Sequence, residues 1–139
     1  MNYSDELTRQ LAKQPGVIAL VGFSPRPGRA SNDVAQYLIQ AGLQVYLVNP
    51  MYAGTESLGQ KVLKGLEDIP EHIHIVDIFR KSEDIGPIID QAISVKVDYI
   101  WLQLDISNPD EEKKAIQAGL GVVKNRCLKV EHMRVQYGG

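Results

Sequence analysis

The fold is decided by the stretch VIALVGFSPRPGRAS, residues 17–31. Residues 17–21 form an unbroken apolar run that ends at Gly22, which is typical of a strand covered on both faces in a parallel sheet. Residues 22–31 then join this run to a helical pattern at 34–41, which Gly42 ends. A strand, a turn and a helix in this order predict the first unit of an α/β fold.

Short apolar runs and helical patterns alternate along the rest of the chain. Further strands are expected at 45–48, 73–79, 99–102 and 122–123. Further helices are expected at 4–14, 85–93 and 108–119, with a short one near 126–133. Pro87 must then lie near the start of its helix, and Asn108 can cap the next one. The stretch 51–70 is irregular, with a small extra strand expected around 60–64.

Strands that alternate with helices require crossover connections, which make a sheet mostly parallel. The sequence therefore predicts an α/β fold, a Rossmann-like three-layer sandwich around a mostly parallel sheet of about five strands. In such a sheet the ligand lies at the carboxyl ends of the strands. The residues that directly follow each predicted strand are therefore the candidates for a binding site.

Length and charge exclude several classes of protein. The 139 residues have the size of one ordinary domain, and 15 basic against 17 acidic residues give a net charge of −2. A nucleic-acid-binding protein usually carries a basic excess, so we expect no nucleic-acid partner. The single cysteine excludes an internal disulfide and a multi-cysteine metal site. The polar N-terminus and short apolar runs favour a soluble cytoplasmic protein without a membrane segment.

The turn after the first strand has the parts of an anion site. Gly22 allows close backbone approach, while Ser24 and Ser31 offer hydroxyls. Arg26 and Arg29 bring positive charge, and the following helix presents free N–H groups. The turn matches neither the dinucleotide fingerprint nor a Walker loop.

A blander interpretation of the same turn is a solvated loop in which Ser31 caps the helix. Asp33 also argues against a phosphate, because it falls in the first turn of the helix and repels an anion unless it faces away. We favour the phosphate site, because two arginines and two prolines are an unusual cost for a mere connection.

Asn49 and Pro50 follow the second strand. NAD-binding domains usually hold an acid here that accepts from the ribose hydroxyl. The neutral asparagine disfavours NAD and leaves NADP or coenzyme A open, with Lys61 and Lys64 nearby in sequence. An ordinary Asn-Pro turn explains the pair at least as well.

The third and fourth strands end in residues of mixed character. Arg80 and Lys81 can meet a phosphate or be solvated, and Asp77 is more readily a structural residue than a catalytic one. Trp101 on an aliphatic strand is typical of a core. Gln103, at the end of that strand, is a candidate donor to an amide-bearing ligand arm.

Two pairs remain as candidates for chemistry. Cys127 and His132 are a conceivable nucleophilic pair, but they lack a third member and an oxyanion-hole sequence. His72 and His74 flank one residue at a strand start, and two histidines alone are weak evidence for a metal. We therefore assign no catalytic residue and no metal site.

Taken in order, these pieces resemble the small stand-alone CoA-binding proteins, whose domain is similar to the N-terminal CoA-binding domain of the succinyl-CoA ligase alpha subunit. The resemblance runs from about residue 17 to about 134, and only the ordered set is specific. The pieces that carry it are VGFS at 21–24, P-x-R-x-S at 27–31, VNP at 48–50, VDIFR at 76–80, WLQ at 101–103 and NRCLKVEH at 125–132.

The resemblance implies a single CoA-binding domain over residues 1–139 with coenzyme A as its ligand. It places Gly22, Ser24, Arg29 and Ser31 around the pyrophosphate and Asn49 and Pro50 by the adenosine. By the same resemblance, the path toward the pantetheine arm is lined by Phe79, Arg80, Trp101 and Gln103. The ligase relatives carry a phosphorylated histidine in a further domain that this chain is too short to hold.

The leading hypothesis is a protein that binds coenzyme A or an acyl-CoA, with no catalysis evident. One alternative is an NADP-dependent or other nucleotide-dependent enzyme that uses Cys127 or His132. Another is a ligand-sensing regulatory protein, and a protein partner or a homo-oligomer stays open. A receiver-like signalling domain is disfavoured, because it needs clustered acids where residues 22–24 stand.

Overall fold

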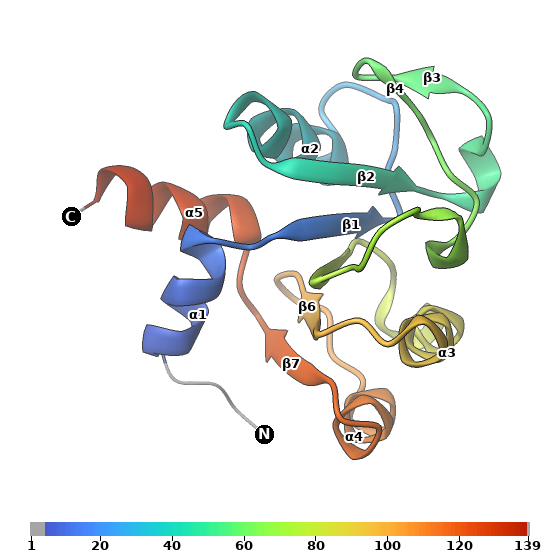
Figure 1. The fold of residues 1–139 in the computed structure, drawn as a ribbon, viewed down its shortest axis with the longest axis vertical. Coiled ribbons are helices and arrows are strands. Elements are labelled where there is room, and N and C mark those ends of the chain that lie inside the picture. Colours follow the sequence, from blue (N-terminus) through green and yellow to red (C-terminus); the bar gives the residue numbers. More distant parts are fainter. Residues whose placement is uncertain (1–4, 139) are drawn as a thin grey trace.

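The computed structural model describes residues 5–138. Helices and strands alternate along the chain except between β2 and β5, where no α-helix intervenes, and Figure 1 shows them by label. The helices are α1 (Asp5–Lys13), α2 (Ala30–Gln40), α3 (Gly86–Val95), α4 (Pro109–Gln117) and α5 (Leu128–Tyr137). The strands are β1 (Val17–Val21), β2 (Gln44–Val48), β3 (Glu56–Ser57), β4 (Gln60–Lys61), β5 (Ile75–Ile78), β6 (Tyr99–Leu102) and β7 (Gly121–Lys124). Three 3-10 turns lie at Pro50–Tyr52, Leu66–Asp68 and Ser82–Asp84.

Five parallel strands form the central sheet in the order β2-β1-β5-β6-β7. The chain moves outward from β1 to β2 and then returns to place β5 on the other side of β1. The crossover direction therefore reverses between β1 and β5, and such a reversal opens a crevice at the carboxyl ends of the strands. The predicted α/β Rossmann-like sandwich with a parallel sheet of about five strands is confirmed.

Helices cover both faces of this sheet (Figure 1). One apolar core lies between the sheet and α1, α2 and α5, and it includes Phe23 and Trp101 among its largest fully buried side chains. A second core lies between the sheet and α3 and α4. All five residues of β1 are buried, as the unbroken apolar run predicts for a central strand.

The helix ends follow the expected capping chemistry in two places. Asn108 caps α4, its side-chain oxygen accepting from the Glu111 backbone N–H at 3.3 Å, while three acidic residues fill the first turn. Pro87 occupies the first turn of α3, where its missing N–H breaks no helical hydrogen bond.

Two local expectations need correction. Helix α2 begins at Ala30 with Arg29 at its N-cap, so Ser31 is not the cap. The extra strand is β4, shorter than the expected range 60–64, and its antiparallel partner β3 has too little apolar pattern to be recognised. The predicted N-terminal helix is present as α1 over Asp5–Lys13, and its predicted first residue, Ser4, lies outside the described residues.

None of the helices described between residues 5 and 138 has both the length and the apolar character needed to span a membrane.

Candidate functional site

Two cavities meet over the carboxyl ends of the central strands. The first has a volume of about 320 Å³ and lies on the side of α3, and the second has about 690 Å³ and lies on the side of α2. They share four lining residues, Gly22, Asn49, Met51 and Arg80. An elongated ligand can therefore pass from one cavity to the other over the end of β1.

Side-chain hydrogen bonds hold the turn after β1 in shape. The hydroxyl oxygen of Ser31 accepts from the Ser24 backbone N–H at 2.9 Å, and Ser24 Oγ accepts from the Arg26 N–H at 3.2 Å. The Asn32 amide donates to the Ser24 carbonyl oxygen at 3.0 Å. Both hydroxyls thus accept from the backbone, which leaves their O–H protons to donate to a ligand.

Arg26 and Arg29 line the second cavity, and both are exposed. Neither side chain makes a hydrogen bond or an ion pair with another residue in the described part of the chain, 5–138. They lie beside the N-terminus of α2, whose first N–H groups have no helical partner and carry a partial positive charge. Cations, helix N–H donors and hydroxyl protons are the groups that an anion site needs, and this turn brings them together.

Gly22 serves the fold as well as the site. Its φ is +89°, and a Cβ atom there lies 2.2 Å from the carbonyl oxygen of Phe79. Only glycine therefore allows the end of β1 to approach the end of β5 so closely. The close approach that the sequence predicts at this glycine is thus made by the protein's own backbone.

Asn49 connects the ends of β1 and β2. Its amide Nδ2 donates to the Phe23 carbonyl oxygen at 2.9 Å, and its Oδ1 accepts from the Met51 backbone N–H at 3.0 Å. The side chain is only 8% exposed. Asn49 is therefore a structural turn residue, which agrees with the simpler of the two interpretations of the Asn-Pro pair.

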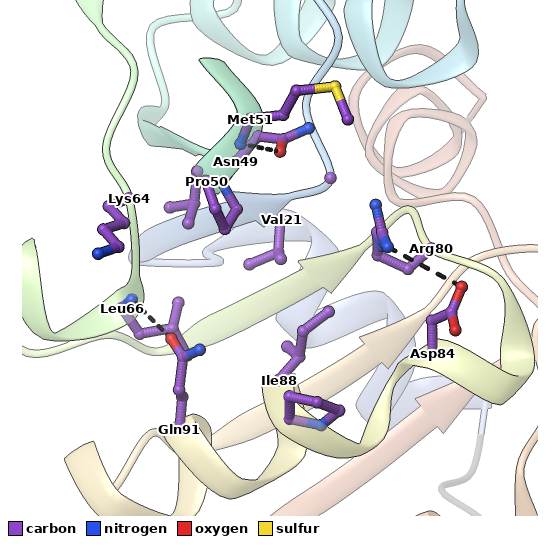
Figure 2. A pocket seen from close by; sticks show the side chains of 13 residues that line it. Val21, Asn49, Pro50, Met51, Lys64, Leu66, Arg80, Asp84, Ile88 and Gln91 are labelled. Atoms are coloured by element: carbon purple, nitrogen blue, oxygen red, sulfur yellow. Dashed lines mark hydrogen bonds and ion pairs between the residues drawn. The ribbon is translucent and has the colours of Figure 1, made fainter. Parts of the chain in front are cut away.

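Lys64 and Arg80 lie on opposite sides of the first cavity in the view of Figure 2. A single parallel bridge between Val48 and Leu63 holds the chain before Lys64 against β2. Arg80 is 3.9 Å from Asp84 across the ion pair, while Lys64 has no polar side-chain partner within residues 5–138. The floor and walls between these cations are apolar: Val21, Val48, Leu66 and Ile88.

The structure brings ten of the eleven predicted site residues to the two cavities. They are Gly22, Ser24, Arg26, Arg29, Ser31, Asn49, Pro50, Phe79, Arg80 and Gln103. Trp101 lines neither cavity, because it is fully buried in the core and its indole N–H donates to the Arg126 carbonyl oxygen at 2.9 Å.

Several lining residues were not predicted from the sequence. Met51 is 76% exposed and lines both cavities, so it lies at their junction. The others with apolar or thiol side chains are Val21, Ala30, Val34, Val48, Tyr52, Leu66, Pro87, Ile88, Leu104, Ile106 and Cys127. Asp33, the acid that argues against a phosphate, does not line either cavity.

Asp77 lies fully buried in β5 between Leu20 and Trp101 of the neighbouring strands. Burial raises the pKa of its carboxyl to about 8, and the hydrogen bond from Gln103 opposes that shift. Gln103 Nε2 donates to Asp77 Oδ1, while Asp77 Oδ2 has no partner among the described residues. The amide nitrogen that the sequence predicts as a donor to a ligand is therefore used within the protein.

Cys127 and His132 do not form a nucleophilic pair in this structure. Cys127 lines the second cavity, whereas His132 is buried and its Nδ1 lies 2.7 Å from the Tyr37 hydroxyl. Burial lowers the pKa of His132. Within residues 5–138 no hydrogen bond joins the thiol to this imidazole, as a nucleophile and its base require.

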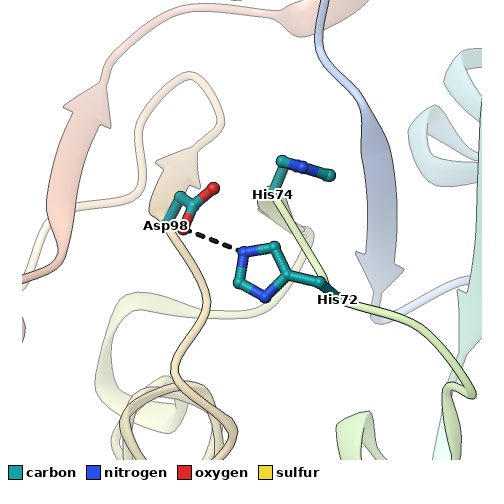
Figure 3. Close-up of side chains that lie close together, drawn as sticks. All are labelled: His72, His74 and Asp98. Carbon is teal, nitrogen blue, oxygen red and sulfur yellow. Dashed lines mark hydrogen bonds and ion pairs between the residues drawn. The ribbon is translucent and has the colours of Figure 1, made fainter.

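His72, His74 and Asp98 gather at the opposite, amino end of the sheet (Figure 3). The Val17 backbone N–H donates to His74 Nδ1 at 3.0 Å, so the neutral ring carries its proton on Nε2. A metal needs an imidazole nitrogen with a free lone pair, and His74 has none to offer. His72 Nε2 is 3.0 Å from Asp98 Oδ1. The cluster therefore connects β1, β5 and β6 and does not suit a metal.

In comparison with known proteins, the chain matches a family of the kind that its sequence motifs resemble. Residues 16–133 match the family described as CoA binding domain. The uncharacterized protein YneT of Bacillus subtilis (strain 168) is 30% identical over 131 residues, which are 94% of this chain and 96% of that protein.

Two solved structures share the whole fold. A protein of Pyrococcus horikoshii OT3, described as hypothetical, superposes with a TM-score of 0.90 at 41% identity, covering 96% of this chain and 92% of its own. A Thermus thermophilus protein, cell-free ID.343, has a TM-score of 0.90 at 33% identity, covering 96% and 99%. The resemblance drawn from the sequence motifs is thereby confirmed.

Proposed function

The chain belongs to the family of CoA-binding domains, and from this premise we propose that it binds coenzyme A or an acyl-CoA across both cavities, with residues 1–139 acting as a single binding domain. The observation that supports this most is a set of cations around the joined cavities that have no ion-pair partner within residues 5–138. These cations are Arg26, Arg29, Lys64 and Lys81. A ligand with phosphates at two separate positions satisfies such a set better than a ligand with one.

The pyrophosphate is assigned to the turn 22–31. There the Ser24 and Ser31 hydroxyls, the guanidinium groups of Arg26 and Arg29 and the first N–H groups of α2 all act as donors. This assignment agrees with the part that the family resemblance gives to the same turn.

The adenosine is assigned to the first cavity. Pro50, Leu66 and Ile88 offer an apolar surface to a purine ring, and Met51 can cover it from the rim. Among residues 5–138, Lys64 is the cation of this cavity without a polar side-chain partner, and we assign it to the 3′-phosphate that distinguishes CoA from dephospho-CoA.

The pantetheine arm then runs through the second cavity along the ends of β5 and β6. Phe79, Leu104 and Ile106 offer apolar contacts, and Gln103 offers an amide group to the arm's peptide-like units. Cys127 lies on the wall of the same cavity. Binding is assigned here without a catalytic step, since no lining residue is paired as nucleophile and base.

Amide chemical-shift mapping with added CoA tests both the ligand and its location. The proposal predicts shifts in the turn 22–31, around Lys64 and around Gln103, with little change at His72 and His74 on the opposite edge. The absence of saturable shifts, or shifts confined to the edge that holds His72, would contradict it.

A further inference from the structure

The fully buried carboxyl group of Asp77 is not explained by the fold. Its strand neighbours in register, Leu20 and Trp101, are apolar, and one of its oxygens has no hydrogen-bond partner among the described residues. Burying a polar group without a partner costs stability, so a carboxyl kept at this place calls for a role outside packing.

The one side-chain hydrogen bond of this carboxyl within residues 5–138 leads to the second cavity. Gln103, which directly follows β6, donates its Nε2 to Asp77 Oδ1 and also lines the second cavity. Its Oε1 makes no hydrogen bond within residues 5–138. The buried side-chain atoms of that region without a hydrogen-bond partner are Asp77 Oδ2 and Glu111 Oε1, so Gln103 Oε1 is not one of them. The amide is therefore bound at its nitrogen end, while its oxygen end stays accessible.

We propose that Asp77 is a positioning residue, which holds the Gln103 amide with its oxygen toward the cavity to accept from a ligand N–H, and that a proton gained by Asp77 reverses this amide. This inference rests on the proposed function, because the pantetheine arm supplies the N–H groups. It names the chemistry that this end of the cavity selects, a hydrogen-bond donor.

The two proton states of Asp77 favour opposite amide orientations. Ionised Asp77 only accepts, so it binds the NH₂ end of Gln103 and leaves the oxygen to the ligand. Protonated Asp77 can donate its O–H to Gln103 Oε1, which turns the NH₂ end to the cavity. Burial, which raises the pKa of Asp77 to about 8, brings this change within reach of neutral solution.

Other titratable groups near this face are already paired or belong to other elements. On α5, His132 contacts Tyr37 of α2, and Glu131 pairs with Arg126 and Arg134. Cys127 lies on the cavity wall, together with the cations Arg26, Arg29, Arg80 and Lys81. None of these contributes to the pKa shift of Asp77, whose causes are burial and Gln103.

The first test is a titration of the ligand-free protein by NMR. The side-chain ¹⁵NH₂ resonances of Gln103 are expected to shift with the same midpoint as the Asp77 carboxyl carbon, and to stay constant in Asp77→Asn. Asn has the same shape without the charge, so the variant keeps the packing. Gln103 resonances that ignore the titration of Asp77 overturn the proposal whether or not CoA binds.

The second test measures CoA affinity from pH 6.5 to 8.5 in the wild type, Asp77→Asn and Gln103→Leu. The CoA affinity of the wild type is expected to rise several-fold between pH 6.5 and 8.5, with release of a proton on binding. This rise is expected to be absent from both variants. Titration of the ligand's own groups cancels in this comparison.

The outcomes separate the two proposals. A pH profile that Asp77→Asn shares with the wild type contradicts the positioning role alone, as does a profile that Gln103→Leu retains. Failure of the wild type to bind CoA at every pH contradicts the proposed function itself, and with it the ligand-selecting role of Gln103.

Discussion

The side-chain amide of Asn49 donates a 2.9 Å hydrogen bond to the backbone carbonyl of Phe23, which ties the end of β2 to the turn after β1. The same side chain accepts from the Met51 N–H at its other end. Asn49→Asp removes the donor and sets a carboxylate against a carbonyl oxygen. We expect a loss of about 1–3 kcal/mol in the free energy of unfolding.

Urea unfolding followed by the fluorescence of Trp101, the only tryptophan, measures this loss. An Asn49→Asp protein as stable as the wild type would show that the amide does not hold the turn.

The two glycines of the turn provide a matched pair for backbone strain. Gly22 and Gly28 both have a φ of +89°, but only at Gly22 does an added Cβ meet another group, the Phe79 carbonyl oxygen at 2.2 Å. Gly28→Ala is expected to cost about 1–2 kcal/mol for the backbone alone. Gly22→Ala adds a clash and is expected to cost about 1–3 kcal/mol more. Equal losses in urea unfolding would contradict this account of the contact between β1 and β5.

Arg29 separates binding from stability. Its side chain makes no capping hydrogen bond, so Arg29→Ala is expected to change the free energy of unfolding by less than about 0.5 kcal/mol. Loss of a charge-assisted contact to the pyrophosphate is expected to weaken CoA binding roughly tenfold. Calorimetry measures the CoA affinities of the wild type and of Arg29→Ala, with Arg9→Ala on α1 as the control. Unchanged affinity in Arg29→Ala removes this arginine from the site.

Lys64 and Lys61 test the assignment of the 3′-phosphate. Lys64 lines the first cavity, while Lys61 lies on β4 and does not. Lys64→Ala is expected to lower the affinity for CoA toward that for dephospho-CoA, and Lys61→Ala is expected to leave the difference between the two ligands intact. If Lys64→Ala keeps the full preference for CoA, the adenosine lies elsewhere.

Asp77 makes stability depend on pH in a stated direction. Its folded pKa of about 8 exceeds the ordinary aspartate value, so between about pH 4 and 8 the folded chain holds a proton that the unfolded chain lacks. Wild-type stability contributed by this group is therefore fully present below that window and is lost as pH rises through it.

Asn at position 77 has no such proton to lose. The stability of Asp77→Asn relative to the wild type is thus expected to grow by up to about 1.4 kcal/mol per pH unit until pH 8, and to level off above it. Urea unfolding at a series of pH values from 5 to 9 gives this difference. A difference that stays constant over the series would show that Asp77 is ionised in the fold throughout.

The fold could be predicted because its strands are buried on both faces and therefore read as short apolar runs. The site could be located in outline for a related reason: the carboxyl ends of parallel strands share one edge of the sheet. Residues as distant in sequence as Arg29, Arg80 and Gln103 follow three such strands, and the structure brings them to one cavity.

What could not be predicted depends on contacts between segments far apart in sequence. Lys64 lines the cavity and Lys61 does not, and the chain before Lys64 is held by a bridge between Val48 and Leu63 that local sequence does not reveal. The burial of Trp101 is expected of an indole on an aliphatic strand, but a strand pattern does not reveal that its N–H donates to the Arg126 carbonyl oxygen.

The same limit applies to the clustered side chains. Asp98 joins His72 through the pairing of β5 with β6, which no local spacing reveals. Cys127 and His132 are five apart in sequence, but the start of α5 directs them to different surroundings.

The central claim is that the joined cavities bind coenzyme A, and calorimetric titration of the wild-type protein with CoA, NAD and NADP under identical conditions tests it most directly. Saturable binding of CoA, tighter than that of either dinucleotide, is the predicted result. Binding of NAD or NADP without binding of CoA would contradict it.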